Sequence, residues 1–469
     1  MLDAKKVILT LADNTTNTIT DSSRLSTEED YSAAIYSKED LIINGNGTLN
    51  VNAGYRNGIK STDDCIIVSG TLNITSTEDG IIGKDLCGVV AGDININAGS
   101  DGIKSTYDTD TTKGNVIIEG GNITIKASND GIQAENILVI NDGTINIKTN
   151  NGAADTTQTH TDNMYMGRGG FGFNNNKTTT TTDDTAESRK GIKAGNMLII
   201  NDGDITIDSD DDSVHCNSEI YIYGGTINAA TGDDGVHADD LLTVNGGTIN
   251  ITQCYEGIEA DDIVINDGDI SVVSSDDGIN SSDGSITING GNLLINASGD
   301  GLDANGSIII NGGYIVVLGP TSDGDTAIDY DDSCTINGGT VMAFGSSGML
   351  EIPKGASNGA CIVTAFTSVS GGSKYTLSDS NGNEILSYTP SKAYAAAIVY
   401  SDKITTGNTY DITAGSTTLS IEVTSDVTSN VSSGLGKTGG MNMPGNSGNM
   451  PNMNNGSSNG NAPQMNNRM

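Results

Sequence analysis

The sequence has no tryptophan, only 4% aromatic residues and 6 prolines in 469 residues. Aromatic side chains supply much of the core of large globular domains, so a conventional globular core of this size would be poorly supplied. The chain has instead 62 glycines and 35% apolar residues. This balance suits a thin core that repeats along the chain.

Positively charged residues are scarce as well. Lys and Arg number 22 against 60 Asp and Glu, which gives a formal net charge of −38. Nucleic acid and anionic membrane surfaces repel such a chain, so neither is expected as a partner. The sequence shows no membrane span and no signal peptide, and a predicted strand follows Met1 almost at once. We therefore expect that the natural start is missing from this chain.

A repeat of about 22 residues runs through most of the chain. Its marker is a glycine before an aliphatic residue, at Gly58, Gly80, Gly102, Gly131, Gly191, Gly235, Gly257, Gly278 and Gly301, with Ser213 and Ala327 in the same slot. Short alternating segments such as "TINIT" and "LLTVN" predict strands, and Asn-Gly, Asp-Gly and Gly-Gly predict turns. Three strands and three turns per repeat predict an all-β fold, a single-stranded parallel β-helix, right-handed as parallel crossovers generally are.

Equivalent positions of the repeat form columns once the coils are stacked. The residue after the repeat glycine is aliphatic and is predicted to point inward, and a small residue follows two positions later. An asparagine in the "NGG" or "NDG" turn is predicted to form a hydrogen-bonded ladder along the axis. The ladder positions are Asn141, Asn201, Asn245, Asn266, Asn289, Asn311 and Asn337.

The six cysteines do not form a disulfide pattern. Cys65, Cys87 and Cys334 stand where other coils have leucine, and Cys216 lies in the small inward column. We predict that they are buried thiols that act as small hydrophobes. A bridge between Cys65 and Cys87 is the alternative, because stacked strands bring Cα atoms to about 4.8 Å.

The repeat divides the chain into three parts. Residues 1–345 are predicted to form the β-helix, with a flexible polar insert at 150–190. Residues 346–425 lose the period and are predicted to form a C-terminal β cap, since an uncovered solenoid end exposes strand edges. Residues 426–469 are a low-complexity Gly/Asn/Met tail that is predicted to be disordered.

Several segments resemble the repeats of a bacterial carbohydrate-binding domain family: "AAIYSKEDLIINGNGTLNV", "SGTLNITSTEDGIIGKD", "SDGIKS" and "AESRKGIKA". Members of that family are secreted, calcium-containing parallel β-helix proteins that bind cellulose and pectin and resemble family-nine polysaccharide lyases in fold. The resemblance covers roughly residues 1–425. It implies an extracellular or cell-surface protein whose ligands are polygalacturonate and cellulose and whose cofactor is Ca²⁺. We expect a monomer.

Acidic residues also fall into columns. The residue before the repeat glycine is an acid in most coils, and a second acid often precedes it. Carboxylates about 4.8 Å apart repel by roughly 0.9 kcal/mol per pair even in water, and Ca²⁺, which takes several oxygen ligands, would offset this repulsion. The predicted ligands are Asp211, Asp212, Asp233, Asp234, Asp239, Asp240, Asp261, Asp262, Asp276, Asp277, Asp300 and Asp303. For each single residue, turn formation alone is the alternative.

The residue that follows each inward aliphatic residue points outward, and this column changes from basic to imidazole to acidic. Such variety suits a groove in which lysines meet uronate carboxylates and calcium bridges uronates to acids. The predicted carbohydrate-binding residues are Lys60, Lys104, Lys193, His215, His237 and Glu259, with Tyr255 near the adjoining turn. A solvated exterior face is the alternative. No transition-metal site is predicted at the histidines, because their neighbours are rich in oxygen.

These features predict an extracellular, calcium-dependent protein that binds acidic plant cell-wall polysaccharide. Cellulose is a second ligand by resemblance alone, since the chain has no row of aromatic residues to grip a flat crystalline surface. One alternative is a calcium-dependent polysaccharide lyase with Lys193 as the base, although nearby acids would raise the pKa of that lysine. The other alternative is a structural or adhesion β-helix that calcium only stiffens.

Overall fold

The computed structural model describes residues 4–22, 32–154 and 188–431. Most of the predicted insert at 150–190, and the predicted disordered tail after residue 431, lie outside these ranges. The described chain contains 44 strands, and none of its residues is in a helix. Accordingly, the search for a helix long and apolar enough to cross a membrane finds none in these ranges.

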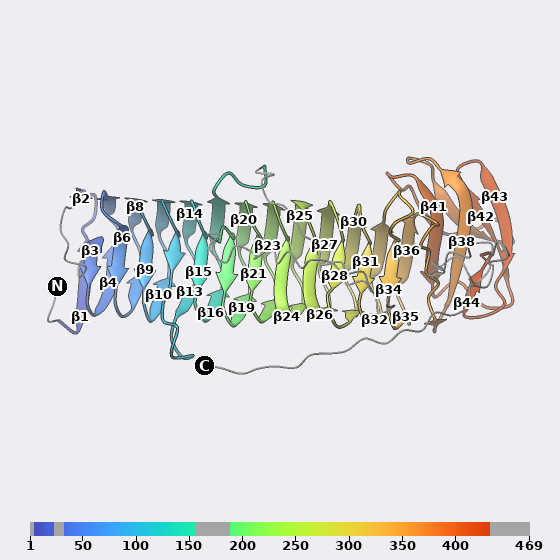
Figure 1. Ribbon diagram of the computed structural model, residues 1–469, viewed down its shortest axis with the longest axis horizontal. Helices are drawn as coiled ribbons and strands as arrows, with labels where there is room; N and C mark the ends of the chain where they lie inside the picture. Colours follow the sequence, from blue (N-terminus) through green and yellow to red (C-terminus); the bar gives the residue numbers. More distant parts are fainter. Residues whose placement is uncertain (1–3, 23–31, 155–187, 432–469) are drawn as a thin grey trace, which may run out of the picture. The chain divides into compact units, whose positions relative to one another are not determined.

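Three strands and three turns make one coil, and successive coils stack in parallel (Figure 1). About 13 turns with a spacing of ~23 residues form a parallel β-solenoid, which confirms the fold predicted from the repeat. One representative coil contains β9 (Ile81–Gly83), β10 (Leu86–Val89) and β11 (Asp93–Ala98). Each of them pairs with the equivalent strand of the coil before and of the coil after. The stacking therefore satisfies both edges of these strands.

The strands form three stacks, one along each side of the coil. The first stack contains β3 (Ala33–Ser37), β6 (Asn57–Ser61), β9, β12 (Ile103–Lys104), β15 (Ile132–Ala134), β18 (Ile192–Ala194), β21 (Val214–Cys216), β24 (Val236–Val244), β26 (Ile258–Ile265), β28 (Ile279–Ser281), β31 (Leu302–Ala304) and β34 (Ile328–Tyr330). The second stack contains β1 (Lys6–Leu11), β4 (Asp40–Gly45), β7 (Cys65–Ile67), β10, β13 (Asn115–Ile118), β16 (Ile137–Ile140), β19 (Met197–Ile200), β22 (Glu219–Ile222), the later parts of β24 and β26, β29 (Ile286–Ile288), β32 (Ser307–Ile310), β35 (Ser333–Ile336) and β37 (Gly355–Ala356). The third stack contains β2 (Thr16–Asp21), β5 (Thr48–Ala53), β8 (Thr71–Ser76), β11, β14 (Asn122–Ala127), β17 (Thr144–Thr149), β20 (Asp204–Ser209), β23 (Thr226–Thr231), β25 (Thr248–Cys254), β27 (Asp269–Ser274), β30 (Asn292–Asn296), β33 (Tyr314–Leu318) and β36 (Thr340–Gly345).

Inward side chains from all three stacks meet in one continuous core. The aliphatic residues after the repeat glycines are each at most 1% exposed, as predicted, at Ile59, Ile81, Ile103, Ile132, Ile192, Val214, Val236, Ile258, Ile279, Leu302 and Ile328. All six cysteines are free and buried, which confirms that interpretation as well. Cys65 and Cys87 lie in register on neighbouring strands, yet they remain thiols rather than a bridge.

The predicted asparagine ladder runs along the turn between the second and third stacks. Asn201 donates its side-chain N–H to the amide oxygen of Asn141 at 2.7 Å, and Asn289 donates to Asn266 at 2.8 Å. Tyr223 holds this slot in the coil after Asn201 and breaks the ladder there. The ladder links neighbouring coils by side-chain hydrogen bonds in addition to the strand pairing.

The C-terminal strands cover the end of the solenoid. Strand β41 (Tyr394–Ser401) pairs antiparallel with β36 and with β38 (Ala360–Val369). Four more strands form an antiparallel sheet, in the order β40 (Glu384–Tyr388), β39 (Tyr375–Asp379), β42 (Thr409–Ala414) and β43 (Thr417–Glu422). Strand β44 (Val427–Ser429) pairs in parallel with β38. The ordered chain thus extends past residue 425, after which the sequence had predicted disorder.

Candidate functional site

The outward side chains of the first stack form one continuous row along the solenoid. The parallel register places Lys193 opposite His215, and His215 opposite His237. We refer to this row as the outward row; it contains Lys60, Lys104, Gln133, Lys193, His215, His237, Glu259, Asn280, Asp303 and Asp329, with Ile82 between the first two lysines. The column read from the sequence is therefore a physical row with one side chain about every 4.8 Å.

A second row, here the acid row, lies three residues earlier in each coil, in the turn that enters the first stack. One oxygen of each aspartate in this row accepts the backbone N–H of the equivalent residue in the next coil. Asp212 accepts from Asp234 at 3.1 Å, and Asp234 accepts from Glu256 at 3.2 Å. The same bond recurs at Asp79, Asp101, Asp130 and Asp277. Backbone hydrogen bonding thus accounts for one oxygen of these aspartates, and it acts between coils rather than within a turn.

The other oxygen of these acids faces the outward row, and its partner changes along the axis. At the basic end, Lys104 donates to Asp101 at 2.6 Å. Towards the acidic end, the Asn280 amide donates to Glu256 at 2.9 Å. The acid row therefore ties the coils together and also orients the side chains of the outward row.

Lys190 takes the acid position in one coil. Its ammonium donates to Asp211 at 2.8 Å and to Asp212 at 2.6 Å. Burial acts against these charges, but the ion pairs raise the pKa of Lys190 and hold the pKa of Asp212 well below its usual range. The Lys190 ammonium therefore pairs with Asp211 and Asp212, two of the predicted calcium ligands. Lys190 was not among the predicted site residues, although its position directly before Gly191 places it in the column of acids.

Lys193, the candidate base, does not bond to that aspartate pair. Its ammonium donates to the Ser188 hydroxyl at 3.2 Å. Lys190, three residues earlier, bonds to those two aspartates instead. The role of Lys193 as a base stays a prediction.

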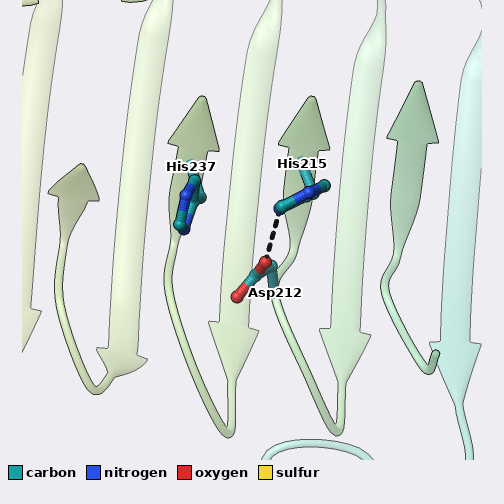
Figure 2. Close-up of side chains that lie close together, drawn as sticks. All are labelled: Asp212, His215 and His237. Atoms are coloured by element: carbon teal, nitrogen blue, oxygen red, sulfur yellow. Dashed lines mark hydrogen bonds and ion pairs between the residues drawn. The ribbon is translucent and has the colours of Figure 1, made fainter. Parts of the chain in front are cut away.

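The two histidines lie on neighbouring parallel strands, with ring centroids 4.9 Å apart and planes tilted by 49° (Figure 2). Asp212 lies in the turn before β21, and one of its oxygens is 2.8 Å from His215 Nδ1. His215 Nε2 is 2.9 Å from the side-chain oxygen of Asn217. Each ring nitrogen of His215 thus has one polar partner.

His237 has carboxylates on both sides of its ring. Nδ1 is 3.1 Å from Asp234 Oδ2 and 3.1 Å from Glu259 Oε2, and Nε2 is 3.4 Å from Asp239 Oδ1. Burial would lower the pKa of His237, but the hydrogen bonds to these three acids raise it far above its usual range. Burial also raises the pKa of Asp234, and His237 offsets part of that shift. The three acids around His237 therefore favour a positive charge at this position of the outward row.

The acidic end of the two rows holds a cluster of aspartates. Asp277, Asp300 and Asp303 each place one carboxylate oxygen within 4.8 Å of the other two. Burial and repulsion between neighbouring acids raise the pKa of Asp277 to about 8 and that of Asp300 to about 9. Clustered carboxylate oxygens are the ligands that Ca²⁺ prefers. These three residues can therefore hold a calcium ion.

We expect the metal-free protein to lose stability as the pH rises from about 5 to about 9. Asp277 and Asp300 have folded-state pKa values of about 8 and about 9, above the value of about 4 for an unfolded chain. Their contribution is fully present below pH about 4 and is lost as the pH rises through the folded-state values. Thermal unfolding in chelator across this range measures the effect. A melting temperature that rises with pH would contradict it.

The other predicted calcium ligands divide into separate groups. Asp211, Asp212 and Asp233 lie together, with the Lys190 ammonium on the first two. Asp234 lies with His237 and Glu259 instead. The acids of the turn after the outward row join none of the metal-binding groups found among the described residues: Asp239, Asp240, Asp261 and Asp262. Three of them accept hydrogen bonds from Ser218, Ser282 and the Ser285 backbone.

Tyr255 lies in the same turn as the doubled acids. Its backbone N–H donates to the Asp233 carbonyl at 2.7 Å, and its carbonyl accepts the N–H of Asp276 at 3.0 Å. The structure therefore places this predicted contact residue, and the predicted calcium ligand Asp276, beside the acid row.

A further acid cluster was not predicted. Asp40, Asp63 and Asp64 come together in the turn between the first and second stacks. Burial and the neighbouring Asp85 raise the pKa of Asp63 to about 6. The neighbouring Asp63 and Asp64 could have indicated this cluster in the sequence, but they lie outside the column of acids that precedes the repeat glycine.

Two comparisons with known proteins give the same description, a carbohydrate-binding domain-containing protein. The sequence profile of a family described as "Carbohydrate-binding domain-containing protein" matches residues 1–235 and 233–426. A carbohydrate-binding domain-containing protein of Acetivibrio thermocellus is 39% identical over 75 residues, which is 15% of this chain and 26% of that protein. The chain thus spans about a quarter of the length of this curated relative. No solved structure matches.

Proposed function

Because this chain belongs to the family of carbohydrate-binding domain-containing proteins, we propose that it binds acidic plant cell-wall polysaccharide, polygalacturonate, outside the cell and with Ca²⁺. The outward row carries the proposal, since its members lie in register in successive coils. A linear polymer needs contacts that repeat along a line, and the row offers one side chain about every 4.8 Å. The proposed binding surface is this row and the acid row beside it.

The two ends of the outward row suit an acidic polymer in different ways. At the basic end, the Lys193 ammonium has a neutral hydroxyl as its hydrogen-bond partner, and it can pair with a uronate carboxylate. At the acidic end, Asp277, Asp300 and Asp303 offer clustered oxygen ligands but no positive charge of their own to a uronate. Ca²⁺ accepts oxygen ligands from both partners and so bridges them. Binding is therefore expected to depend on Ca²⁺.

Cellulose is a second candidate ligand because of one feature of the second stack. Tyr223 is 53% exposed. Its ring and that of Tyr221 are nearly parallel, with planes 16° apart and centroids separated by 6.5 Å. Exposed aromatic rings offer an apolar face to a sugar ring and a polar edge to its hydroxyls. Tyr223 occupies the position that neighbouring coils give to a ladder asparagine. This coil therefore lacks the asparagine hydrogen bond and carries an exposed aromatic ring there.

Retention on immobilised polygalacturonate tests the proposal. We expect the purified chain to be retained with Ca²⁺ and released by a chelator, while circular dichroism shows that it stays folded. Asp303→Asn should weaken retention about tenfold or more, because it removes one of three clustered carboxylates. The matched control is Asp269→Asn on the third stack, where the carboxylate accepts a hydrogen bond from Asn292. This variant should behave like the wild type.

Two outcomes would overturn parts of the proposal. Absence of retention with and without Ca²⁺ would reject polygalacturonate, and sedimentation with insoluble cellulose would then test the second ligand. Retention that persists in chelator would reject bridging by calcium while leaving the outward row as the binding surface.

A further inference from the structure

Both ring nitrogens of His237 face carboxyl groups. A neutral ring carries one N–H and one lone pair, so it can donate to carboxylates from one side only. Here Nδ1 faces Asp234 and Glu259, and Nε2 faces Asp239. One side would therefore set a nitrogen lone pair against carboxylate oxygens. A further proton, on the ring or on a facing carboxyl, or a metal ion must therefore lie between the ring and these acids.

We propose that Asp234 Oδ2, His237 Nδ1 and Glu259 Oε2 bind a first-row divalent metal ion of the Zn²⁺ class. The three atoms lie within 4.8 Å of one another, and Nδ1 is 3.1 Å from each of the two oxygens. With bonds of about 2.0–2.2 Å, neighbouring ligand atoms of a tetrahedral or octahedral zinc site are about 2.9–3.5 Å apart. The nitrogen-to-oxygen distances thus already match those of a metal site.

The residues behind these ligands have the arrangement that metal sites use. A histidine ligand usually donates its other ring N–H to a carboxylate, which fixes the ring and its tautomer. Asp239 stands at 3.4 Å from Nε2 in that position. Asp234 is oriented as well, because its other oxygen accepts the Glu256 N–H at 3.2 Å. Both contacts hold the ligands in place without using the atoms that face the metal.

Asp212, His215 and His237 also bring their ligand atoms within 4.8 Å of one another, but a lysine competes for the acid of that group. Asp212, the acid beside His215, already holds the Lys190 ammonium at 2.6 Å. Among the described residues, no lysine or arginine forms an ion pair with Asp234 or Glu259. The acids that a metal ion could neutralise thus lie one coil further along, at His237, whose side chain is 24% exposed.

The nature of the ligands separates this site from the aspartate cluster. Calcium takes oxygen ligands at longer distances, whereas imidazole nitrogen favours zinc and its neighbours in the first transition row. Glu259 is 20% exposed, so the open side of the ion is accessible to water or to a carboxylate of a ligand. The inference rests on this geometry and not on polysaccharide binding, and its test therefore uses the metal alone.

Titration of the metal-free full chain with Co²⁺ and Zn²⁺ tests the site. We expect a Co²⁺ absorption band at one equivalent, its loss when Zn²⁺ is added, and release of about one proton per ion as the metal replaces the proton on Nδ1. Glu259→Gln should weaken binding about tenfold or more, and His237→Gln should abolish the band. His215→Gln, one coil earlier in the same row, is the matched control and should bind like the wild type.

The proposal is overturned if the wild type binds neither ion, or if His237→Gln binds as tightly as the wild type. Loss of binding in His215→Gln would also overturn it, since the ion would then lie between Asp212 and the first histidine. Thermal melts of the metal-free variants show whether each one folds. Retention on polygalacturonate is scored separately, so failure of one proposal leaves the other measurable.

Discussion

Gly235→Ser is expected to lower the free energy of unfolding by about 2–3 kcal/mol, a large effect for overpacking of a core. A Cβ atom at Gly235 would lie 2.5 Å from the Gly257 carbonyl oxygen in the next coil and 2.5 Å from Cδ1 of Ile251. The carbonyl oxygen cannot withdraw without moving the backbone of the next coil, and Cδ1 of Ile251 can do so only by repacking the core. Urea unfolding of wild type and variant measures the difference.

The chain itself shows how such a Cβ can be accommodated. Ser213 and Ala327 stand in the slot of the repeat glycine. In the third strand of those two coils, the inward position is an alanine, Ala229 or Ala343, where the coils with glycine have isoleucine or valine. The register confirms the position, since Ala229 lies opposite Ile251 of the next coil. The side-chain volume added at the glycine slot is thus offset by a smaller side chain in the third strand of the same coil.

This exchange predicts that Ile251→Ala rescues Gly235→Ser in part. Ile251→Ala alone should cost about 2–5 kcal/mol, because it leaves a cavity. The double variant should cost less than the sum of the two single changes, with a coupling of about 1 kcal/mol or more. Gly324→Ser is the control: nothing lies within 4 Å of a Cβ built at Gly324, so little change is expected. Strict additivity would contradict the proposed exchange of volume.

The architecture could be predicted because the contacts of a solenoid join residues one period apart. Once Gly58 and its equivalents had set the period, the buried column after them and the ladder through Asn201 and Asn289 followed. Each of those predictions needed only the residue type at an equivalent position. The same logic placed His215 beside His237 in one outward row.

The partners of the charged side chains could not be predicted in the same way. Two lysines, Lys190 and Lys193, are both within reach of the Asp211–Asp212 turn, and the period does not decide which one bonds to it. The choice depends on rotamers and on the hydrogen bond that Lys193 makes to Ser188. Nor does a column reveal that each aspartate of the acid row uses one oxygen for the backbone of the next coil. Which oxygen of a carboxylate bonds to the backbone depends on the side-chain rotamer in the packed structure.

Lys190→Met is expected to cost about 3–5 kcal/mol of unfolding free energy near neutral pH, as when one partner of a buried ion pair is removed. The Lys190 side chain is 14% exposed and that of Asp212 is 3% exposed. Methionine keeps a stem of similar length, so the change removes the charge rather than the packing. Without the ammonium, Asp212 keeps its hydrogen bonds with His215 and with a backbone N–H.

The pH dependence distinguishes this loss of charge from a general loss of packing. The ion pair holds the pKa of Asp212 below its usual range. Its contribution is therefore fully present above the unfolded-state value of about 4 and disappears as the pH falls through the folded-state value. The difference in unfolding free energy between Lys190→Met and the wild type should thus become smaller at acidic pH. Lys374→Met removes an exposed pair with Glu384, whose side chains are 53% and 50% exposed, and it should change stability little at any pH. Equal stability of the two variants at neutral pH would show that the solenoid does not depend on an internal cation at Asp212.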